Sequence, residues 1–167
     1  RHSIFEIIED VSKVAFMPIT VGGRIRTMND IEKRLACGAD KVAINTIAIE
    51  NPNFIENAAK EFGSQCIVIS IDVKDQNGTP IVVSQRGKIP THYLPEEWAK
   101  IVEDVGAGEI LLNSIDRDGM KVGYDIELLH RVTGATTVPC PSSASAAAAR
   151  PLLTAPVVVP PALSASA

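Results

Sequence analysis

The residue with the clearest chemical potential is Asp72, which follows the apolar segment 66–71 (Cys-Ile-Val-Ile-Ser-Ile). A β-branched run that ends in an acid is typical of a buried strand delivering a carboxylate to its C-terminal end. In parallel α/β folds those strand ends hold the catalytic groups, so Asp72 is a candidate catalytic residue. An acid at this place is also typical of a turn or a helix cap, and spacing alone leaves both interpretations open.

Three more segments that could bind a ligand follow apolar stretches. In Thr20–Gly23 the glycines would let backbone N–H groups approach a phosphate at a helix N-terminus, or form a plain tight turn. Asn45 and Thr46 would complete the same anion site, or form an Asx or Ser/Thr turn. Asp118 and Gly119 would bind ligand hydroxyls or phosphate, or form a solvated turn. All of these lie after consecutive strands, and such ends share one face of a parallel sheet.

The elements that must position these residues alternate between strand and helix. We expect helices after the N-caps Ser3 (with Glu6), Thr27 and Asp125 and after the prolines Pro52 and Pro95, with stops at Gly38, Gly63 and Gly134. We expect strands over residues 16–21, 41–45, 66–71, 109–113 and 136–138, and a hairpin extension over 81–84.

This order predicts parallel strands with helices outside them. The short, even βα spacing favours a barrel over a doubly wound sheet, although a complete eight-unit barrel needs about 250 residues. We therefore expect a partial barrel over residues 1–139 of this 167-residue chain.

Residues 140–167 differ in composition: they hold no acids and consist mostly of Ala, Ser, Pro, Val, Leu and Thr. Such a low-complexity tail should not be assigned an element. A strand and glycine loop read one nucleotide out of frame would give a similar Pro-Ser-Ser and alanine run. We therefore interpret the tail as a frameshift near Cys140 or as a disordered segment, and sequencing the coding DNA would distinguish the two.

The bulk composition is that of an ordinary globular domain, with 46% hydrophobic and 22% charged residues and a net charge of −4. Mild acidity gives no support to a nucleic-acid or membrane partner. Cys37, Cys66 and Cys140 are odd in number and far apart, which predicts free thiols in a reducing, cytoplasmic compartment and no metal site. No apolar run approaches the roughly 20 residues of a membrane span, and the start Arg1-His2-Ser3 does not read as a signal peptide.

Several segments together resemble one known family. They are Phe16–Gly23, Ile25–Thr27, Gly38–Thr46, Phe62–Cys66, Ser70–Asp72, Gly106–Gly119 and Gly123–Asp125. From about residue 3 to Pro139 the chain closely resembles the cyclase subunit of imidazole glycerol phosphate synthase, of histidine biosynthesis. The resemblance implies a (β/α)8 TIM barrel of the ribulose-phosphate-binding type. This chain would hold strands three to seven, with strand eight in the tail.

The resemblance also implies a lyase reaction in which ammonia converts a bis-phosphorylated formimino-aminoimidazole carboxamide nucleotide. The products are imidazole glycerol phosphate and an aminoimidazole carboxamide ribotide, and no cofactor is implied. Asp72 matches one of two acid–base aspartates; the other belongs to strand one, which this sequence does not contain. The residues matching one phosphate region are Thr20, Gly22, Gly23, Asn45 and Thr46, and those toward the other end of the substrate are Asn113, Asp118 and Gly119.

Arg24 stands where the family has a third glycine, so that its side chain either blocks close backbone approach or contacts the phosphate itself. At the opposite end, Lys41 and Glu109 match the charged ring where ammonia enters, or form an ordinary ion pair. Asp40 matches the face that meets a glutamine amidotransferase (glutaminase) subunit in a heterodimer.

Two other functions stay open. One is a paralogous subunit for sugar amidation in surface-polysaccharide biosynthesis, which segments 112–116 and 95–98 also resemble. The other is an inactive half-barrel remnant, because one catalytic strand is missing and open strand edges invite association.

Overall fold

The computed structural model of the chain describes residues 3–120, 123–143 and 157–159. Its elements are α1 (Ile4–Ser12), β1 (Ile19–Gly22), α2 (Met28–Ala36), β2 (Lys41–Ile44), α3 (Thr46–Glu50), α4 (Asn53–Phe62), the 3-10 turn η1 (Ser64–Cys66), β3 (Ile67–Gln76), β4 (Thr79–Ser84), β5 (Ile89–Pro90), α5 (Pro95–Asp104), β6 (Glu109–Ser114), α6 (Ile126–Ala135), β7 (Ser142–Ser143) and β8 (Val157–Val159).

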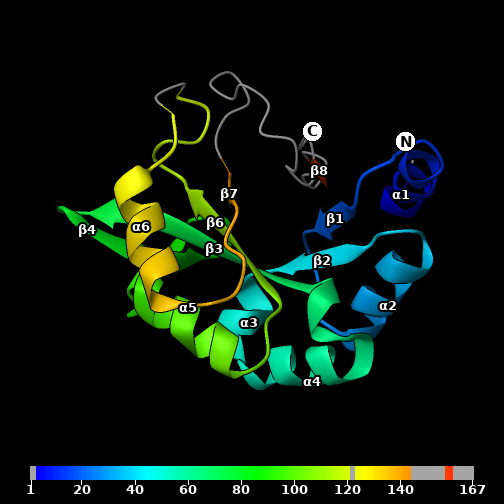
Figure 1. Cartoon of the computed structure of the whole chain (residues 1–167), viewed down its shortest axis with the longest axis horizontal. Helices are drawn as coiled ribbons and strands as arrows, with labels where there is room; N and C mark the ends of the chain where they lie inside the picture. Colours follow the sequence, from blue (N-terminus) through cyan, green and yellow to red (C-terminus); the bar gives the residue numbers. More distant parts are fainter. Residues whose placement is uncertain (1–2, 121–122, 144–156, 160–167) are drawn as a thin grey trace.

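The strands form one mixed sheet with β3 at its centre. Along the order β8-β1-β2-β3-β6-β7 every pairing is parallel, whereas β4 and β5 add to β3 as an antiparallel hairpin. Helices α2 to α5 lie on one side of the strands, below them in the view of Figure 1. The prediction of an α/β fold with parallel strands and helices outside is confirmed.

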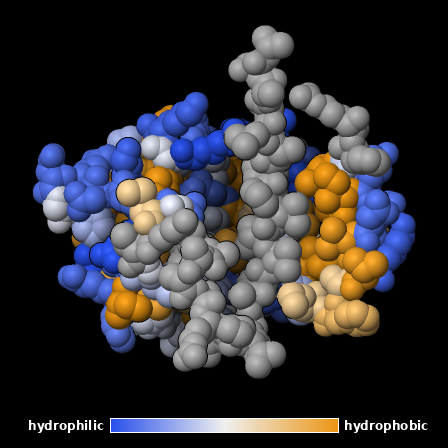
Figure 2. Space-filling view, turned by 90° about the horizontal axis from the view of Figure 1, so that it is seen from above, coloured by the Kyte–Doolittle hydropathy of each residue, from blue (hydrophilic) through white to orange (hydrophobic). Residues whose placement is uncertain are grey.

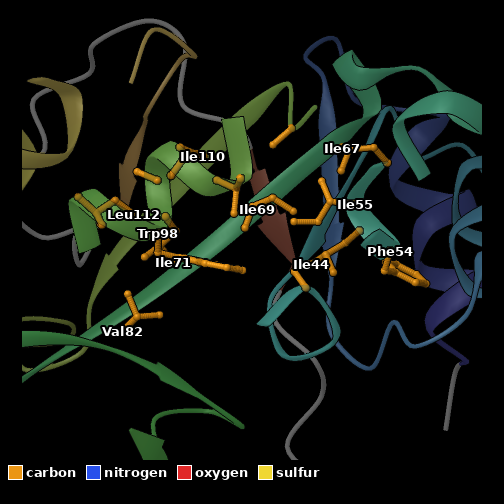
Figure 3. Close-up of a cluster of buried hydrophobic side chains, with 14 of the residues drawn as sticks. Ile44, Phe54, Ile55, Ile67, Ile69, Ile71, Val82, Trp98, Ile110 and Leu112 are labelled. Carbon is orange, nitrogen blue, oxygen red and sulfur yellow. The ribbon is translucent and has the colours of Figure 1, made fainter. Parts of the chain in front are cut away.

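The main hydrophobic core fills the space between this side of the sheet and the helices. Figure 3 shows Ile69 and Ile71 of β3 beside Ile55 of α4 and Trp98 of α5, and all four side chains are fully buried. A second cluster, with Ile8 at its centre, joins α1 to β1. Because a buried large side chain contributes roughly 1.5–3 kcal/mol relative to exposure, these clusters supply most of the stabilisation.

The local signals for helix starts are confirmed by hydrogen bonds. Ser3 and Glu6 form a capping box at α1, and Thr27 and Asp30 form another at α2. Asp125 caps α6 by accepting from the Leu128 N–H. The cysteines Cys37, Cys66 and Cys140 are all free, as expected from their spacing.

The ends of three predicted elements are wrong. The buried strand begins at Ile19 and not at Phe16, whose side chain is fully exposed. Helix α6 continues through Gly134 to Ala135, because Gly134 does not adopt the positive φ of a helix-ending glycine and glycine is tolerated inside a helix at modest cost. Strand β3 continues four residues past Asp72, to Gln76. Its β2 partner ends at Ile44, and β4 folds back onto the edge that β2 leaves open.

The strand predicted to begin over 136–138 starts later, because residues 137 and 138 form a bend and regular pairing begins only at β7. The carbonyl groups of Pro139 and Pro141 accept hydrogen bonds from Ile110 and Leu112 of β6. Proline has no N–H to return, so a regular ladder appears only at Ser142–Ser143. Most of the tail predicted to be low-complexity, residues 144–156 and 160–167, lies outside the described residues.

Two glycine-to-alanine changes test how tightly the backbone is packed before β6. A Cβ on Gly108 would lie 2.1 Å from the Ser64 carbonyl oxygen, whereas a Cβ on Gly134 would meet nothing within 4 Å. We expect Gly108→Ala to destabilise the chain by about 3 kcal/mol through overpacking. Gly134→Ala should stabilise it by roughly 0.5–1 kcal/mol through helix propensity. Urea unfolding followed by Trp98 fluorescence measures both, and equal effects of the two changes would contradict this packing.

Candidate active site

The face of the sheet opposite the main core carries a separate set of side chains. Because side chains alternate along a strand, every second residue of β2, β3 and β6 points to this inner face. Its middle is a small apolar cluster of Ala43, Val68 and Leu111. Polar residues lie on either side of this cluster along the strands, so the inner face has two polar ends.

Asp72 lies at the end of the inner face where the parallel strands finish. In the β3–β6 register Asp72 is directly opposite Asn113. Its Oδ1 accepts a hydrogen bond from Asn113 Nδ2 at 3.2 Å and another from Ser70 Oγ at 3.3 Å. Both donors lie on the inner face, and they hold the carboxylate at this end of the sheet. The end of the inner face where the parallel strands finish is called the rim.

Burial raises the pKa of the Asp72 carboxyl above its ordinary value, and the nearby charge of Asp118 raises it further. The hydrogen bonds from Asn113 and Ser70 act in the opposite direction and limit the rise. A carboxyl held in this way keeps a protonated fraction closer to neutral pH than a solvated aspartate does. Asp72 therefore has the surroundings of a general acid–base group.

Asn45 and Thr46 lie at the same end, immediately after β2. The Asn45 amide donates to the Ser70 carbonyl at 3.0 Å instead of capping α3. The Thr46 hydroxyl accepts from the Gln85 N–H at 3.3 Å and lies 3.4 Å from Asn45 Oδ1. The two polar side chains are thus joined to β3 and to the end of β4.

The glycine turn after β1 combines a close backbone contact with β2 and two residues of positive φ. A Cβ on Gly22 would lie 3.1 Å from the Cβ of Ala43, and Gly23 and Arg24 have φ angles of +97° and +54°. The carbonyl of Gly23 accepts a 2.8 Å hydrogen bond from the guanidinium of Arg34, a buried residue of α2. Arg24 is exposed, so the turn accommodates its side chain by directing it outward.

The start of α2, where the sequence suggested an anion, already carries the negative charge of Asp30. The Asp30 carboxylate accepts from the N–H groups of Arg26 and Thr27, and the hydrogen bond from Arg26 is the main reason why its pKa is lowered. A negative charge therefore already occupies this helix N-terminus. An anion at the rim would have to use the glycine turn and the Asn45–Thr46 pair instead.

Thr20 does not join the other predicted phosphate residues. In the β1–β2 register it is opposite Lys41, at the start of β2, whereas Gly22 is opposite Ala43. Thr20 is 1% exposed, and its hydroxyl has no hydrogen-bond partner among the described residues. It therefore belongs to the end of the inner face far from Asp72.

Asp118 and Gly119 lie in the exposed loop after β6, as expected. The Asp118 N–H donates to the Ser114 carbonyl at 3.0 Å. The preceding Asp116 accepts a 2.6 Å hydrogen bond from the Asp75 N–H, which ties this loop to the β3–β4 hairpin. Asp118 is close enough to affect the pKa of Asp72.

The opposite end of the inner face is charged. Lys41 and Glu109, the first residues of β2 and β6, form an ion pair across β3. Asp40 pairs with the backbone of Ile19 in both directions, as acceptor at 2.8 Å through its carboxylate and as donor at 2.9 Å through its N–H. Burial, with a smaller contribution from Glu109, raises the pKa of the Cys140 thiol to about 11, so this thiol is neutral.

Sequence reasoning missed two residues of the site. Ser70 precedes Asp72 by two positions, and strand periodicity could have placed both on one face. No sequence pattern indicated that Arg34 is buried beneath the glycine turn, because a basic residue in the last turn of a helix normally contacts solvent. Among residues 3–120, 123–143 and 157–159, no three His, Cys, Asp or Glu side chains gather as metal ligands. No helix in the same ranges is long and apolar enough to cross a membrane.

Comparison with known proteins connects this geometry to a family. A sequence model described as "Histidine biosynthesis protein" matches residues 1–153. The chain belongs to this histidine biosynthesis family. It is 45% identical over 146 residues to "Imidazole glycerol phosphate synthase subunit HisF" of Saccharolobus solfataricus, covering 87% of this chain and 58% of that protein. It is 42% identical over 166 residues to the protein of the same name from Exiguobacterium sp., covering 99% of this chain and 65% of that protein. The chain thus spans about three fifths of the length of these relatives.

The surroundings of Asp72 predict a specific pH effect on stability. Because the folded chain raises the pKa of this carboxyl, the folded state binds its proton more tightly, and ionisation at higher pH costs stability. We expect Asp72→Asn to stabilise the chain at pH 7 and 8. The gain should disappear as the pH falls toward the ordinary aspartate value of about 3.9.

Urea unfolding of both proteins between pH 4 and 8 measures this difference. Asp104→Asn, which changes an exposed aspartate of α5, is the matched control and should show no such trend. A gain for Asp72→Asn that is largest at pH 4 would contradict the assignment.

Proposed function

We propose that this chain carries the cyclase (lyase) site of imidazole glycerol phosphate synthase in histidine biosynthesis. The observation that carries the proposal is the half-buried Asp72 carboxyl, held by Asn113 and Ser70 on a rim shared with Asn45 and the glycine turn. The names of the relatives, at 42–46% identity, support the same activity.

We also propose that the sheet is part of a (β/α)8 barrel, with β1, β2, β3, β6 and the segment at β7 as strands three to seven. Helices cover one face, and the inner face has the small apolar middle and polar ends that a barrel interior needs. Residues 1–139 would form this domain, and residues 140–167 a separate tail.

In the proposed reaction Asp72 exchanges a proton with the bis-phosphorylated substrate as ammonia adds and the ring closes. A raised pKa suits this role, because proton transfer is most effective when the catalytic pKa lies near the working pH. A second acid–base group, the strand-one aspartate of the family, would complete the pair. Neither step requires a metal or an organic cofactor.

The substrate's two phosphates would lie at opposite sides of the rim. Gly22, Gly23, Asn45 and Thr46 offer backbone and side-chain donors for one phosphate. Asn113 and the loop Asp118–Gly119 would contact the part of the substrate toward the other. Thr20, which lies at the far end, is left out of this set.

The far end of the inner face would receive ammonia from a glutaminase subunit. Lys41 and Glu109 would form the gate, and Asp40 would contact the partner. The surface beside Asp40 is a shallow hollow of about 350 Å³ with Phe16 and Met17 in its lining. These two side chains are 105% and 52% exposed, and Figure 2 shows apolar surface on the side of α1. Large exposed apolar side chains are typical of a protein-docking surface.

A biosynthetic subunit of this kind would work in the cytoplasm.

The proposed site predicts where the products bind. We expect imidazole glycerol phosphate to shift the backbone amide NMR signals of Gly23, Asn45 and Thr46 in the full chain. Thr46→Val should weaken this binding by about tenfold through loss of one hydrogen bond to a charged group. Thr79→Val, the same change at an exposed site on β4, should leave the affinity unchanged. Shifts confined to other surfaces would contradict the proposal.

A turnover measurement addresses the role of Asp72. We expect very low ammonia-dependent product formation by the chain alone, since proton transfer in both directions requires two groups. Asp72→Asn should abolish this residual activity while retaining product binding within about threefold. Turnover that survives Asp72→Asn would remove Asp72 from the mechanism.

A further inference from the structure

Arg34 is an unusual residue to find beneath a turn. It is 6% exposed, and its two terminal nitrogens donate to carbonyl oxygens, that of Asp30 at 2.7 Å and that of Gly23 at 2.8 Å. Its Nε has no acceptor among the described residues. The Asp30 carboxylate is turned away, toward Arg26 and Thr27. Burying a guanidinium that forms no hydrogen bond to a carboxylate is costly, and the nearby Asp30 charge offsets only part of that cost, so the contact with Gly23 requires an explanation.

The contact determines which way one peptide group faces. In a planar trans peptide the C=O and the N–H point in opposite directions. Because Arg34 holds the Gly23 carbonyl toward α2, the N–H of Arg24 must point away from α2. That N–H has no acceptor in the part of the chain that the structure describes. It is therefore free to donate to a ligand on the side of the turn that faces away from α2.

The backbone of Arg24 shows that this orientation is enforced. Its φ of +54° lies in the left-handed region, which costs a non-glycine residue about 1 kcal/mol or more. Turning the Gly23–Arg24 peptide over by about half a turn would return Arg24 to ordinary negative φ. The flip would also place the Gly23 carbonyl oxygen, instead of an N–H, toward the rim, where it would repel an anion.

We propose that Arg34 is a positioning residue that locks the Gly23–Arg24 peptide with its N–H facing outward, and thereby makes the glycine turn selective for a phosphate dianion. The phosphate part of this proposal rests on the proposed function. The orientation of the peptide does not, because it can be measured without any ligand. Arg34 itself touches no substrate and acts only through the peptide it holds.

The test compares the full chain with Arg34→Met, which removes both donors while keeping an extended side chain. The three-bond HN–Hα coupling of Arg24 reports its φ, and titration with inorganic phosphate, read at the Arg24 amide, reports binding. In Arg34→Met we expect the coupling to change to that of an extended residue and the phosphate affinity to fall about tenfold. Arg26→Met removes an exposed arginine nearby that pairs with Glu50, and it should change neither measurement.

A double-variant cycle separates this role from a general loss of packing. Glycine has no free-energy penalty for positive φ. In an Arg24→Gly background, turning the peptide between positions 23 and 24 over therefore relieves less strain. Arg34→Met should then weaken phosphate binding by only about threefold, a difference that simple destabilisation would not produce. Arg34→Leu, which also removes both donors and is a good helix former, must move the coupling in the same direction as Arg34→Met, which keeps the test decisive even where Arg34→Met fails to fold.

The outcomes are distinguishable. An unchanged Arg24 coupling in the folded Arg34 variants overturns the positioning role. A wild-type chain whose Arg24 amide ignores phosphate, with the coupling still dependent on Arg34, contradicts the phosphate assignment alone and leaves the orientation of the peptide standing.

Discussion

The pairing of β3 with a parallel strand on each side is the constraint on which the rest of the structure depends. Its register with β6 sets Asp72 opposite Asn113, and its register with β2 places Ala43 opposite Val68. A shift of one residue would turn every side chain to the other face. The carboxyl would then enter the apolar core, and isoleucines would line the rim. The ten-residue run of β3 therefore fixes both the core and the chemistry.

The inner face has two separate polar ends because its middle is apolar. Ala43, Val68 and Leu111 separate the Lys41–Glu109 ion pair from the Asp72 rim. Because Lys41 and Glu109 neutralise each other and lie beyond this layer of side chains, they are not among the groups that shift the pKa of Asp72. The apolar layer allows an acidic group to be tuned at one end while an ion pair persists at the other.

Much of this arrangement could be predicted from the sequence, because it follows from local patterns. The strand before Asp72, the capping boxes and the strand ends at Asn45 and Asn113 depend on residues close together in the chain. Thr20 lies apart from the other predicted phosphate residues because β1 has only four residues, so two positions along it separate one end of the inner face from the other. The contact from Arg34 to Gly23 could not be predicted, since it depends on how α2 is rotated against β1, and no local pattern specifies that angle.

The β3–β4 hairpin has a consequence beyond its own stability. Thr46 holds one end of it through Gln85, and Asp116 holds the other through Asp75. The Asn45–Thr46 segment and the loop after β6, proposed to contact opposite ends of the substrate, are therefore hydrogen-bonded to the same hairpin. Any bending of that hairpin would therefore displace both segments together and would change the distance across the rim as a single coordinate.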